Sequence, residues 1–269
     1  MPSDLFFALV ALLITLIGAT HYFFKVKKHA TPKMPLLFIA FLLAASLTSL
    51  ISLYLTITSV SLLSVFVIAA ALMPIMMTIV FYIAFKEGKP PLGNIQVKVG
   101  DQILPFYSTR FDGNEFNSKE LSRQRVLLKF YRGAWCPYCS SELKMFEEMK
   151  PLFDQYNVRI VALSNDDKAS VKQHIKRDKL NLTLLSDPKL KVIRQYGVEH
   201  HKALGGEIRT SKTLFGLPFP MILKYKSMAI PTSILIDENG VVQWIDQSDD
   251  VRIRASKKNI EVALSTSFA

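Results

Sequence analysis

The feature that most constrains this chain is a long uncharged segment: residues 35 to 85 contain no Asp, Glu, Lys, Arg or His. A helix needs about 20 apolar residues to cross the roughly 30 Å hydrocarbon core of a bilayer. The segment is too long for one crossing and long enough for two. We predict transmembrane helices over residues 35–57 and 61–85, with a turn near Thr56 to Ser61. Buried helices of a soluble core are the alternative, but no soluble fold of this size needs such a run.

A second apolar segment begins near the N-terminus and covers residues 5–24, where His21 is the only residue that titrates near neutral pH. Its length suits one more membrane span. A cleaved signal peptide normally opens with a basic region. Here Asp4 stands in that place, and basic residues follow the apolar stretch instead. We therefore predict a retained helix, and an integral protein of the inner or plasma membrane whose first partner is the lipid bilayer.

The orientation in the membrane is predicted from basic residues near the spans, which are Lys25, Lys27, Lys28, Lys33, Lys86 and Lys89. Three spans place both basic groups on one side, and loops rich in Lys and Arg stay in the cytoplasm. The C-terminal part is thus expected on the cytoplasmic side; an error of one span would place it on the periplasmic side. Ala45, Ser49 and Ser52 also give the second span a small-residue face for close helix contact.

The rest of the chain has the composition of a soluble domain. The whole sequence holds 33 Lys and Arg against 22 Asp and Glu, a net charge of +11. After the apolar segments, roughly 180 residues remain, which is enough for one domain with its own core. The basic excess is spread along the chain, so we expect no nucleic-acid partner. The predicted organisation is a membrane domain over 1–85, a linker over 86–99 and a soluble domain over 100–269.

Short β-rich runs alternate with amphipathic stretches of helix length in the soluble part, which is typical of an α/β layer. Asn239-Gly240 predicts a hairpin turn, and Asn165 or Asp166 is expected to cap a helix. The expected strands are 126–131, 158–164, 182–185, 232–237 and 241–245, and the expected helices are 137–156, 168–179, 188–196 and 254–264. We predict a mixed, mostly parallel central sheet with helices on both faces.

The chain has two cysteines, and they stand together as Cys136-Pro137-Tyr138-Cys139. The preceding strand and the favourable proline at the first helical position place Cys136 at a helix N-terminus. Free N–H groups there stabilise a thiolate. Cys139 lies one turn further on the same face, so the two sulfurs can form a disulfide. We expect an exposed Cys136 that attacks and a Cys139 that resolves, as thiol–disulfide exchange requires.

Other uses of a cysteine pair predict different surroundings. A structural zinc site needs two more ligands, and His174, His200 and His201 do not have the spacing of a zinc finger. We predict no metal site and no cofactor. Two inert buried cysteines, or a non-catalytic copper carrier or redox sensor that exploits the affinity of thiolates for Cu(I), remain alternatives.

The segment from Phe130 to Cys139, with its Trp-Cys-Pro-Tyr-Cys motif, resembles the thioredoxin-like superfamily, and within it the peroxiredoxin-like AhpC/TSA branch. Further similarity lies in Ser186-Asp187-Pro188, Gln195-Tyr196-Gly197-Val198, the hairpin from Ile234 to Gly240 and the opening segment from Val99 to Phe106. The resemblance covers roughly residues 97–265. It implies an α/β thioredoxin-like fold, preceded here by the three transmembrane helices.

The same resemblance implies site residues. Ile230-Pro231-Thr232 is similar to the cis-proline loop that faces the two cysteines in this superfamily, so Pro231 and Ile230 are expected to bind the substrate backbone. Trp135, Pro137 and Tyr138 are further candidates for substrate contact. Thioredoxins carry a buried Asp on the preceding strand; here Lys129 lies near that place. We expect its side chain to face solvent; the alternative is an inward-pointing lysine that lowers the pKa of the thiol.

Departures from the peroxiredoxin pattern bear on the activity. Alignment on Phe130-Tyr131 places Arg132 at the proline and Cys136 at the threonine of the peroxidatic loop, whereas Cys139 takes the peroxidatic position. The later arginine position falls on Pro231. These departures favour a membrane-anchored thiol–disulfide oxidoreductase over the alternative, a thiol-dependent peroxidase with an antioxidant role.

The two activities imply different partners. The substrate would be a protein disulfide or a hydroperoxide, and the reductant a thiol such as thioredoxin or glutathione. Residues 199–229 are an insertion, interpreted as a satellite core under a long loop; a lid near the cysteines or a surface that touches lipid is the alternative.

Overall fold

The computed structural model describes residues 2–58, 63–207, 213–220 and 222–268. The chain forms two compact units, Met1–Gly88 and Lys89–Ala269. Each unit is described separately below.

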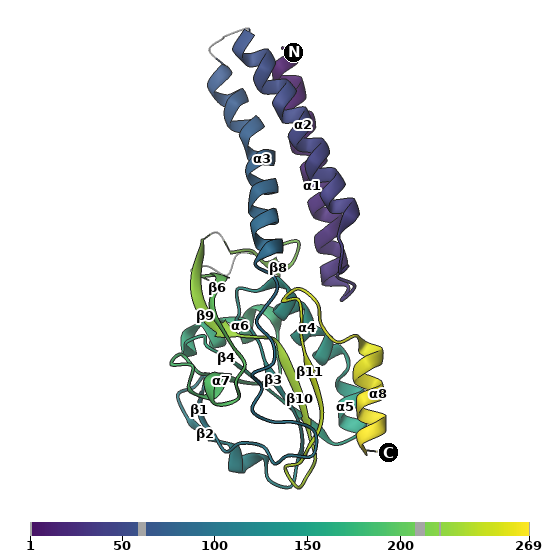
Figure 1. Cartoon of the computed structure of the whole chain (residues 1–269), viewed down its shortest axis with the longest axis vertical. Helices are drawn as coiled ribbons and strands as arrows, with labels where there is room; N and C mark the ends of the chain where they lie inside the picture. Colours follow the sequence, from purple (N-terminus) through teal and green to yellow (C-terminus); the bar gives the residue numbers. More distant parts are fainter. Residues whose placement is uncertain (1, 59–62, 208–212, 221, 269) are drawn as a thin grey trace. The chain divides into compact units, whose positions relative to one another are not determined.

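The first unit consists of three helices, α1 (Ser3–Lys27), α2 (Leu36–Thr58) and α3 (Ser64–Lys86) (Figure 1). All three are long and apolar enough to cross a membrane. The predicted spans agree with these helices to within a few residues at each end. The predicted turn and the start of the third span include residues 59–62, which lie outside the described residues.

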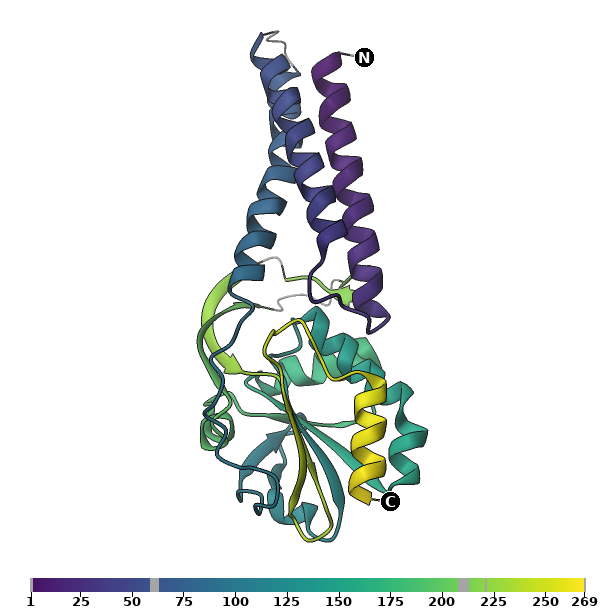
Figure 2. The same ribbon diagram turned by 45° about the vertical axis from the view of Figure 1, so that its right-hand side comes forward.

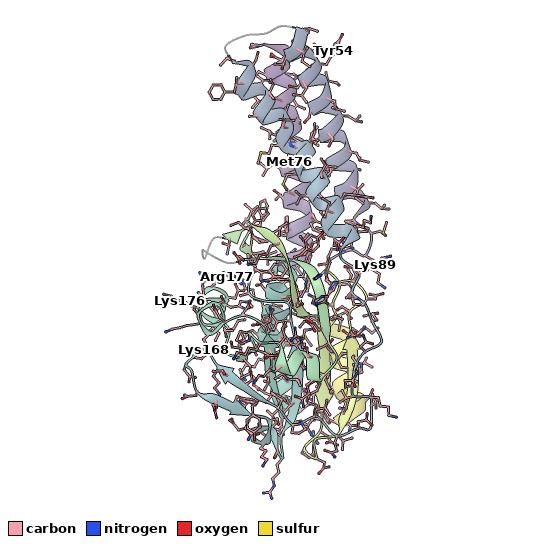
Figure 3. The ribbon with its side chains drawn as sticks, turned by 60° about the vertical axis from the view of Figure 1, so that its left-hand side comes forward. Tyr54, Met76, Lys89, Lys168, Lys176 and Arg177 are labelled. Carbon is pink, nitrogen blue, oxygen red and sulfur yellow. The ribbon has the colours of Figure 1, made fainter. Side chains whose placement is uncertain are left out.

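Small and hydroxylated side chains let α1 and α2 pack closely. Ala45, Ser49 and Ser52 are fully buried on α2, as their spacing predicts. A Cβ on Gly18 of α1 would lie 2.6 Å from Cβ of Phe41. Larger apolar side chains, such as those of Tyr54 and Met76 in Figure 3, point away from the helices and are exposed. Contact through small residues replaces the hydrophobic drive that is missing between helices in lipid.

The second unit is built on a seven-stranded sheet with the order β11-β10-β3-β4-β5-β1-β2. The strands are β1 (Tyr107–Arg110), β2 (Glu115–Asn117), β3 (Arg125–Phe130), β4 (Val158–Ser164), β5 (Thr183–Ser186), β10 (Thr232–Ile236) and β11 (Val242–Gln247). The sheet is mixed, as predicted. Parallel pairing is confined to β3–β4 and β4–β5, a smaller part than expected, because β1 and β2 add antiparallel pairs that the sequence pattern did not indicate.

Helices cover both faces of this sheet (Figures 1 and 2). On one face lie α4 (Pro137–Glu148), α5 (Lys150–Gln155), α6 (Lys168–Asp178) and α8 (Lys257–Phe268); on the other lie α7 (Lys191–Gln195) and the 3-10 turn η1 (Ser118–Leu121). In the central strand β3, Leu127 packs under α4, whereas Val126 and Leu128 pack toward α7. This alternation follows from the two-residue period of a strand.

Two helix predictions are corrected by the structure. The stretch 137–156 forms two helices rather than one, broken at Met149. Pro151 lies two residues after Met149, and proline cannot continue the hydrogen-bond ladder of the preceding helix. The cap of α6 is Asp167, whose carboxylate accepts the Ser170 N–H at 2.7 Å, not Asn165 or Asp166.

The insertion at 199–229 is a β ribbon in its described parts. The strands β6 (Glu199–Gly206) and β9 (Leu223–Ala229) pair antiparallel, and β7 (Thr213–Leu214) pairs with β8 (Leu217–Pro218). Ala203 and Met228 belong to the same apolar cluster as the two cysteines. The ribbon is thus part of the main core, which corrects the interpretation as a satellite core.

Candidate active site

The two cysteines open α4 directly after the central strand. Cys136 is the N-cap residue, its sulfur accepts the Cys139 N–H at 3.4 Å, and Pro137 is the first helical residue, as predicted. Both thiols are free, with exposed fractions of 1% for Cys136 and 0% for Cys139. The expectation of an exposed Cys136 is therefore wrong for this structure, because Trp135 and the β6–β9 ribbon pack in the same cluster.

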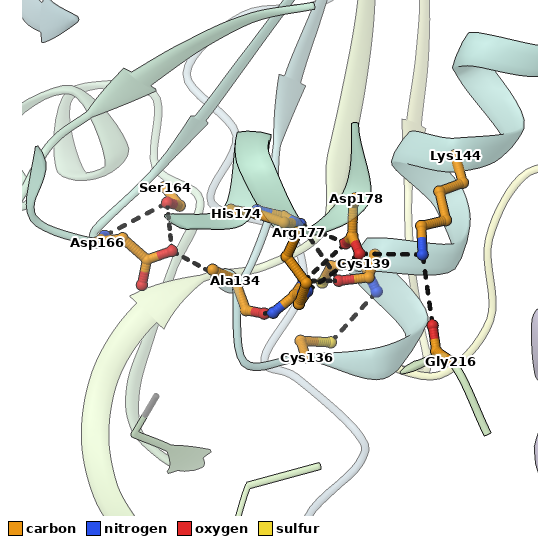
Figure 4. Close-up of polar contacts among 11 residues, drawn as sticks. Ala134, Cys136, Cys139, Lys144, Ser164, Asp166, His174, Arg177, Asp178 and Gly216 are labelled. Atoms are coloured by element: carbon orange, nitrogen blue, oxygen red, sulfur yellow. Dashed lines mark hydrogen bonds and ion pairs between the residues drawn. The ribbon is translucent and has the colours of Figure 1, made fainter. Parts of the chain in front are cut away.

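One buried polar cluster, centred on residues of α6, contacts the loop before Cys136 (Figure 4). Arg177 donates to the Ala134 carbonyl at 2.8 Å and to the Ser140 hydroxyl at 2.7 Å. Its partner Asp178, 2.6 Å away, also pairs with Lys144 at 2.9 Å. Burial opposes ionisation, but bonds from His174 and Arg177 hold the pKa of Asp178 far below its usual range. This cluster ties α6 to both ends of the cysteine segment.

A second carboxylate, Asp166, supports the same loop from the other side (Figure 4). It accepts the Ala134 N–H at 2.7 Å and the Ser164 hydroxyl at 3.1 Å. Burial raises the pKa of Asp166. Gly133 has φ of +138°, and a Cβ there would lie 2.8 Å from Oδ1 of Asp166 and from Nε1 of Trp135. Only glycine fits this approach without strain.

A second buried cluster reaches the sulfur of Cys139. Lys129 donates to Glu142 at 2.7 Å and to the Ser233 hydroxyl at 3.0 Å. The other oxygen of Glu142 accepts from Nε of Arg254 at 2.8 Å, and Nη2 of Arg254 lies 3.4 Å from Sγ of Cys139. Lys129 is fully buried, so the expectation of a solvent-facing lysine is wrong. Both faces of the central strand are covered, and none of its side chains beyond the first faces solvent.

The pKa values of the two thiols shift in opposite directions in this arrangement. Burial raises the pKa of Cys136 well above its usual value, and so does its interaction with Cys139. Burial also acts on Cys139, but the bond from Cys136 and the charge of Arg254 outweigh it and lower the pKa of Cys139 to about 6. The charge of Arg254, 3.4 Å from Sγ of Cys139, therefore favours the thiolate form of Cys139.

Trp135 packs in the same cluster as the pair and has two cations near its ring. The guanidinium of Arg132 lies 5.2 Å and the ammonium of Lys226 lies 5.4 Å from its ring centre. Arg132 also donates to the Leu204 carbonyl at 2.7 Å. A polar cavity of about 420 Å³ opens next to this ring, lined by Ala134, Trp135, Asn165, Asp166, Asp167, Ser170, Pro188, Gly206, Glu207 and Lys226. The cavity therefore reaches the two residues that precede Cys136.

The other predicted contact residues lie near the C-terminal end of the central strand β3. Thr232 of β10 pairs with Phe130 of β3, so Pro231 lies at the end of β10 where the cysteine loop leaves β3. Pro231 and Ile230 are buried, whereas Pro137 and Tyr138 are half-buried. The Ile230–Pro231 bond is trans, which corrects the cis-proline expectation. The two isomers of an X–Pro bond differ by only about 0.5–1 kcal/mol, so the sequence motif does not fix the isomer.

Three residues of the charged clusters around the pair were missed in the sequence. Glu142 and Arg177 stand on predicted helices without a motif, and Arg254 was only the expected first residue of the last helix. One signal was available: Glu142 lies three residues after Cys139, on the helix face that carries the cysteines. In the described parts of the chain, no group of three or more His, Cys, Asp or Glu side chains is placed to hold a metal ion.

A CxxC pair that opens the helix after the central strand of a mixed sheet defines a thioredoxin-like redox protein. Residues 99–245 match the sequence profile of the AhpC/TSA family. The match covers more than half of the chain, and the chain belongs to this family. The family prediction made from the motifs is thereby confirmed.

Two kinds of relative match the second unit. The chain is 29% identical over 104 residues to the thiol-disulfide oxidoreductase ResA of Bacillus cereus, a match that covers 38% of this chain and 60% of that protein. It is 29% identical over 111 residues to the peroxiredoxin Bcp of Escherichia coli, covering 41% and 71%. The chain thus spans less than two thirds of the length of the first relative. Both relatives are thiol oxidoreductases, the class that the sequence predicts.

Solved structures agree in fold. A thiol peroxidase from Chromobacterium violaceum superposes with a TM-score of 0.51 at 16% identity, covering 66% of this chain and 91% of that chain. At this identity the likeness concerns the fold alone. It supports the thioredoxin-like arrangement of the second unit.

Proposed function

We propose that this protein is a membrane-anchored thiol–disulfide oxidoreductase that uses Cys136 and Cys139 as a dithiol–disulfide couple. The observation that carries the proposal is the pair of free thiols at the start of α4, where the Cys139 N–H donates to Sγ of Cys136 at 3.4 Å. A dithiol of this kind gives two electrons to a substrate disulfide through a mixed disulfide. The relative ResA bears the same activity in its name.

The roles of the two cysteines follow their places on the helix. Cys136, at the N-cap, attacks the substrate, because its sulfur lies at the positive end of the α4 dipole. Cys139 then attacks the mixed disulfide and releases the reduced substrate. Pro231 and Ile230 bind the substrate backbone beside the C-terminal end of β3. The surface around the sulfurs is formed by Trp135, Pro137 and Tyr138. Since both sulfurs are buried, Trp135 or the ribbon has to move when a substrate enters.

The three apolar helices are proposed to anchor the protein in the bilayer, with residues 1–85 as membrane domain, 86–99 as linker and 100–269 as redox domain. The basic residues beside the spans favour a cytoplasmic redox domain. In that compartment the pair rests as a dithiol and acts as a reductant. A protein disulfide is then the substrate, and thioredoxin or a glutathione-type thiol restores the dithiol.

The activity is tested with the full chain in detergent, by following insulin disulfide reduction in the presence of dithiothreitol. We expect turnover by the unmodified chain and background rates for Cys136→Ser. When reduced Cys139→Ala is mixed with insulin after dithiothreitol has been removed, a mixed disulfide with the substrate should accumulate, and mass spectrometry should find it on Cys136. Insulin reduction that survives Cys136→Ser would contradict the proposal.

Thiol-dependent peroxidase activity is the second candidate, favoured by the Bcp match and by Cys139, which has the peroxidatic position and an arginine on its sulfur. Hydroperoxide consumption by the same preparation separates the two. Fast peroxide turnover that survives Cys136→Ser would favour the peroxidase. A copper carrier or redox sensor would instead bind Cu(I) stoichiometrically and turn over neither substrate.

The side of the membrane is tested by a reporter fused after the last residue. Alkaline phosphatase is active only in an oxidising compartment, because it needs its disulfides. We expect an inactive fusion. An active one would place the redox domain outside the cytoplasm and reverse the proposed direction of electron flow.

A further inference from the structure

Arg254 is a buried cation whose position is fixed on all sides. Its Nε donates to Glu142 at 2.8 Å, and its Nη1 donates to the carbonyls of Val251 at 2.8 Å and Ile253 at 2.7 Å. The remaining nitrogen, Nη2, lies 3.4 Å from Sγ of Cys139. The side chain is 9% exposed and that of Glu142 is 1% exposed. In such a dry site, a fixed positive charge acts strongly on a neighbouring sulfur.

We propose that Arg254 holds Cys139 as the thiolate of the pair, and that this thiolate serves both steps of disulfide exchange, first as the base for Cys136 and then as the resolving nucleophile. The inference rests on the function proposed above. Arg254 is a positioning residue in this scheme, because it acts through Cys139 and does not touch the substrate.

The hydrogen bonds of the two sulfurs support this assignment. Sγ of Cys139 accepts from the guanidinium of Arg254, a charged donor, at 3.4 Å. For Cys136 the corresponding donor is the Cys139 N–H at 3.4 Å. Donors favour the charged form of the group that accepts them. The bonds therefore place the charge on Cys139, although the α4 dipole favours a thiolate at Cys136.

The steps balance in protons and electrons. As Cys136 attacks the substrate disulfide, its proton moves to the Cys139 thiolate, and one substrate thiolate leaves. That thiolate takes the proton from Cys139, whose low pKa makes it the stronger acid. Cys139 then attacks Sγ of Cys136, forms the intramolecular disulfide and releases the second substrate thiolate, which takes a proton from water. The dithiol loses two electrons and the substrate disulfide gains them.

Several charged and titratable groups face Cys139 and act on its charge. They are Cys136 at the N-cap of α4, Glu142 on α4, Tyr131 and Arg132 in the loop after β3, and Arg254 in the segment before α8. Glu142 opposes the thiolate, but it is bonded to Lys129 as well as to Arg254. Arg254 is the one side chain among these that carries a full positive charge and donates to the sulfur.

The test follows the reaction of the reduced full chain with dithiobis(nitrobenzoate), an aromatic disulfide that releases one coloured thiolate per step. The first release reports attack by Cys136, and the second reports resolution by Cys139. The variants are Arg254→Gln, Arg254→Lys and, as matched control, Arg252→Gln. Arg252 is a buried arginine of the same segment, paired with Asp250 at 2.6 Å. Circular dichroism checks that each variant is folded.

At about pH 7 we expect Arg254→Gln to slow the second release about tenfold or more, because a return of the Cys139 pKa from about 6 toward the ordinary cysteine value of about 8.5 removes most of the thiolate. The difference should vanish above about pH 9, where Cys139 ionises without help. Arg254→Lys should keep part of the rate, and Arg252→Gln should keep all of it. A second release in folded Arg254→Gln with an unchanged pH profile would overturn the proposal, and so would an equal loss in Arg252→Gln.

A direct titration covers the case in which the two releases overlap. In Cys136→Ser, the ultraviolet absorbance of the Cys139 thiolate is followed against pH with and without Arg254→Gln. We expect the midpoint to rise by at least one unit; an unmoved midpoint would overturn the proposal. Failure of the proposed function would look different, because insulin would then remain oxidised while both releases and the titration still depended on Arg254.

Discussion

Two buried arginines flank α4, and they are bonded in different ways. Arg177 pairs with Asp178 and ends on a carbonyl and a hydroxyl of the cysteine segment. Arg254 pairs with Glu142 and ends on the sulfur of Cys139. Both pairs are almost completely removed from water, where an ion pair gains little net stability but is costly to break.

The difference gives the two arginines different roles, Arg177 in positioning the backbone and Arg254 in the protonation of a thiol. A bond to the Ala134 carbonyl fixes where the backbone lies and leaves the proton affinity of the thiols largely unchanged. A bond to Cys139 Sγ stabilises one protonation state of the reacting atom. We therefore expect changes around Arg177 to appear in the free energy of unfolding, and changes around Arg254 to appear in the pH dependence of the thiols as well.

The largest effect is expected for Glu142→Gln, which leaves Lys129 and Arg254 as two buried cations without a carboxylate. Removing one partner of a buried ion pair costs about 3–5 kcal/mol. Urea unfolding of the full chain measures it through tryptophan fluorescence, since Trp135 and Trp244 are the two tryptophans and both lie in the second unit.

The matched control for this change is Glu148→Gln on the same helix. Glu148 pairs with Lys257 at 2.6 Å, but both side chains are about half exposed. An exposed pair of this kind contributes at most about 1 kcal/mol. If Glu142→Gln and Glu148→Gln lowered the free energy of unfolding equally, the buried ion pairs of Glu142 would contribute no more to stability than an exposed pair.

Arg177→Gln is expected to have the next largest effect. It removes charged donors from Ala134 and Ser140, but Asp178 keeps Lys144 and His174 as partners. Bonds to charged groups contribute about 1.5–3 kcal/mol, and we expect a loss in this range. The Cys139 titration should move less than in Arg254→Gln. A larger shift in Arg177→Gln would mean that the two arginines do not have separate roles.

Local patterns in the sequence predict the frame of the site. The strand before the motif, the proline after Cys136 and the helical spacing to Cys139 each follow from short-range rules, and they place both sulfurs at the start of α4. The membrane helices follow from length and apolarity, and the stripe of Ala45, Ser49 and Ser52 follows from helical periodicity.

The charged groups behind the sulfurs are a different case. Arg254 and Glu142 are 112 residues apart in the chain, and no local rule relates them. Lys129 shares the strand parity of Leu127, which packs under α4. That parity identifies the buried face only when it is known that α4 covers it. The sequence alone favoured a solvent-facing lysine, and the tertiary packing decided against it.

Burial of His200 gives an effect that depends on pH. Arg132 lies near His200, and burial together with this positive charge lowers the pKa of His200 to about 4. The unfolded chain binds a proton there below about pH 6.5 and the folded chain does not, so stability falls as pH drops from about 6.5 to about 4. The slope for one proton is about 1.4 kcal/mol per pH unit. In His200→Phe the unfolding free energy should lose this slope; an unchanged slope would assign it to other groups.

The smallest expected effects come from the hydroxyl groups at the ends of the two clusters. Ser140→Ala removes an acceptor of Arg177, and Ser233→Ala removes an acceptor of Lys129. Each should cost about 1 kcal/mol, the usual net contribution of one hydrogen bond. Neither should move the Cys139 titration by a measurable amount, because neither hydroxyl bonds to Arg254 or to the sulfur. A shift in Ser233→Ala alone would mean that the charge at Cys139 depends on the whole chain from Lys129 onward, and Arg254 would then be one part of that chain.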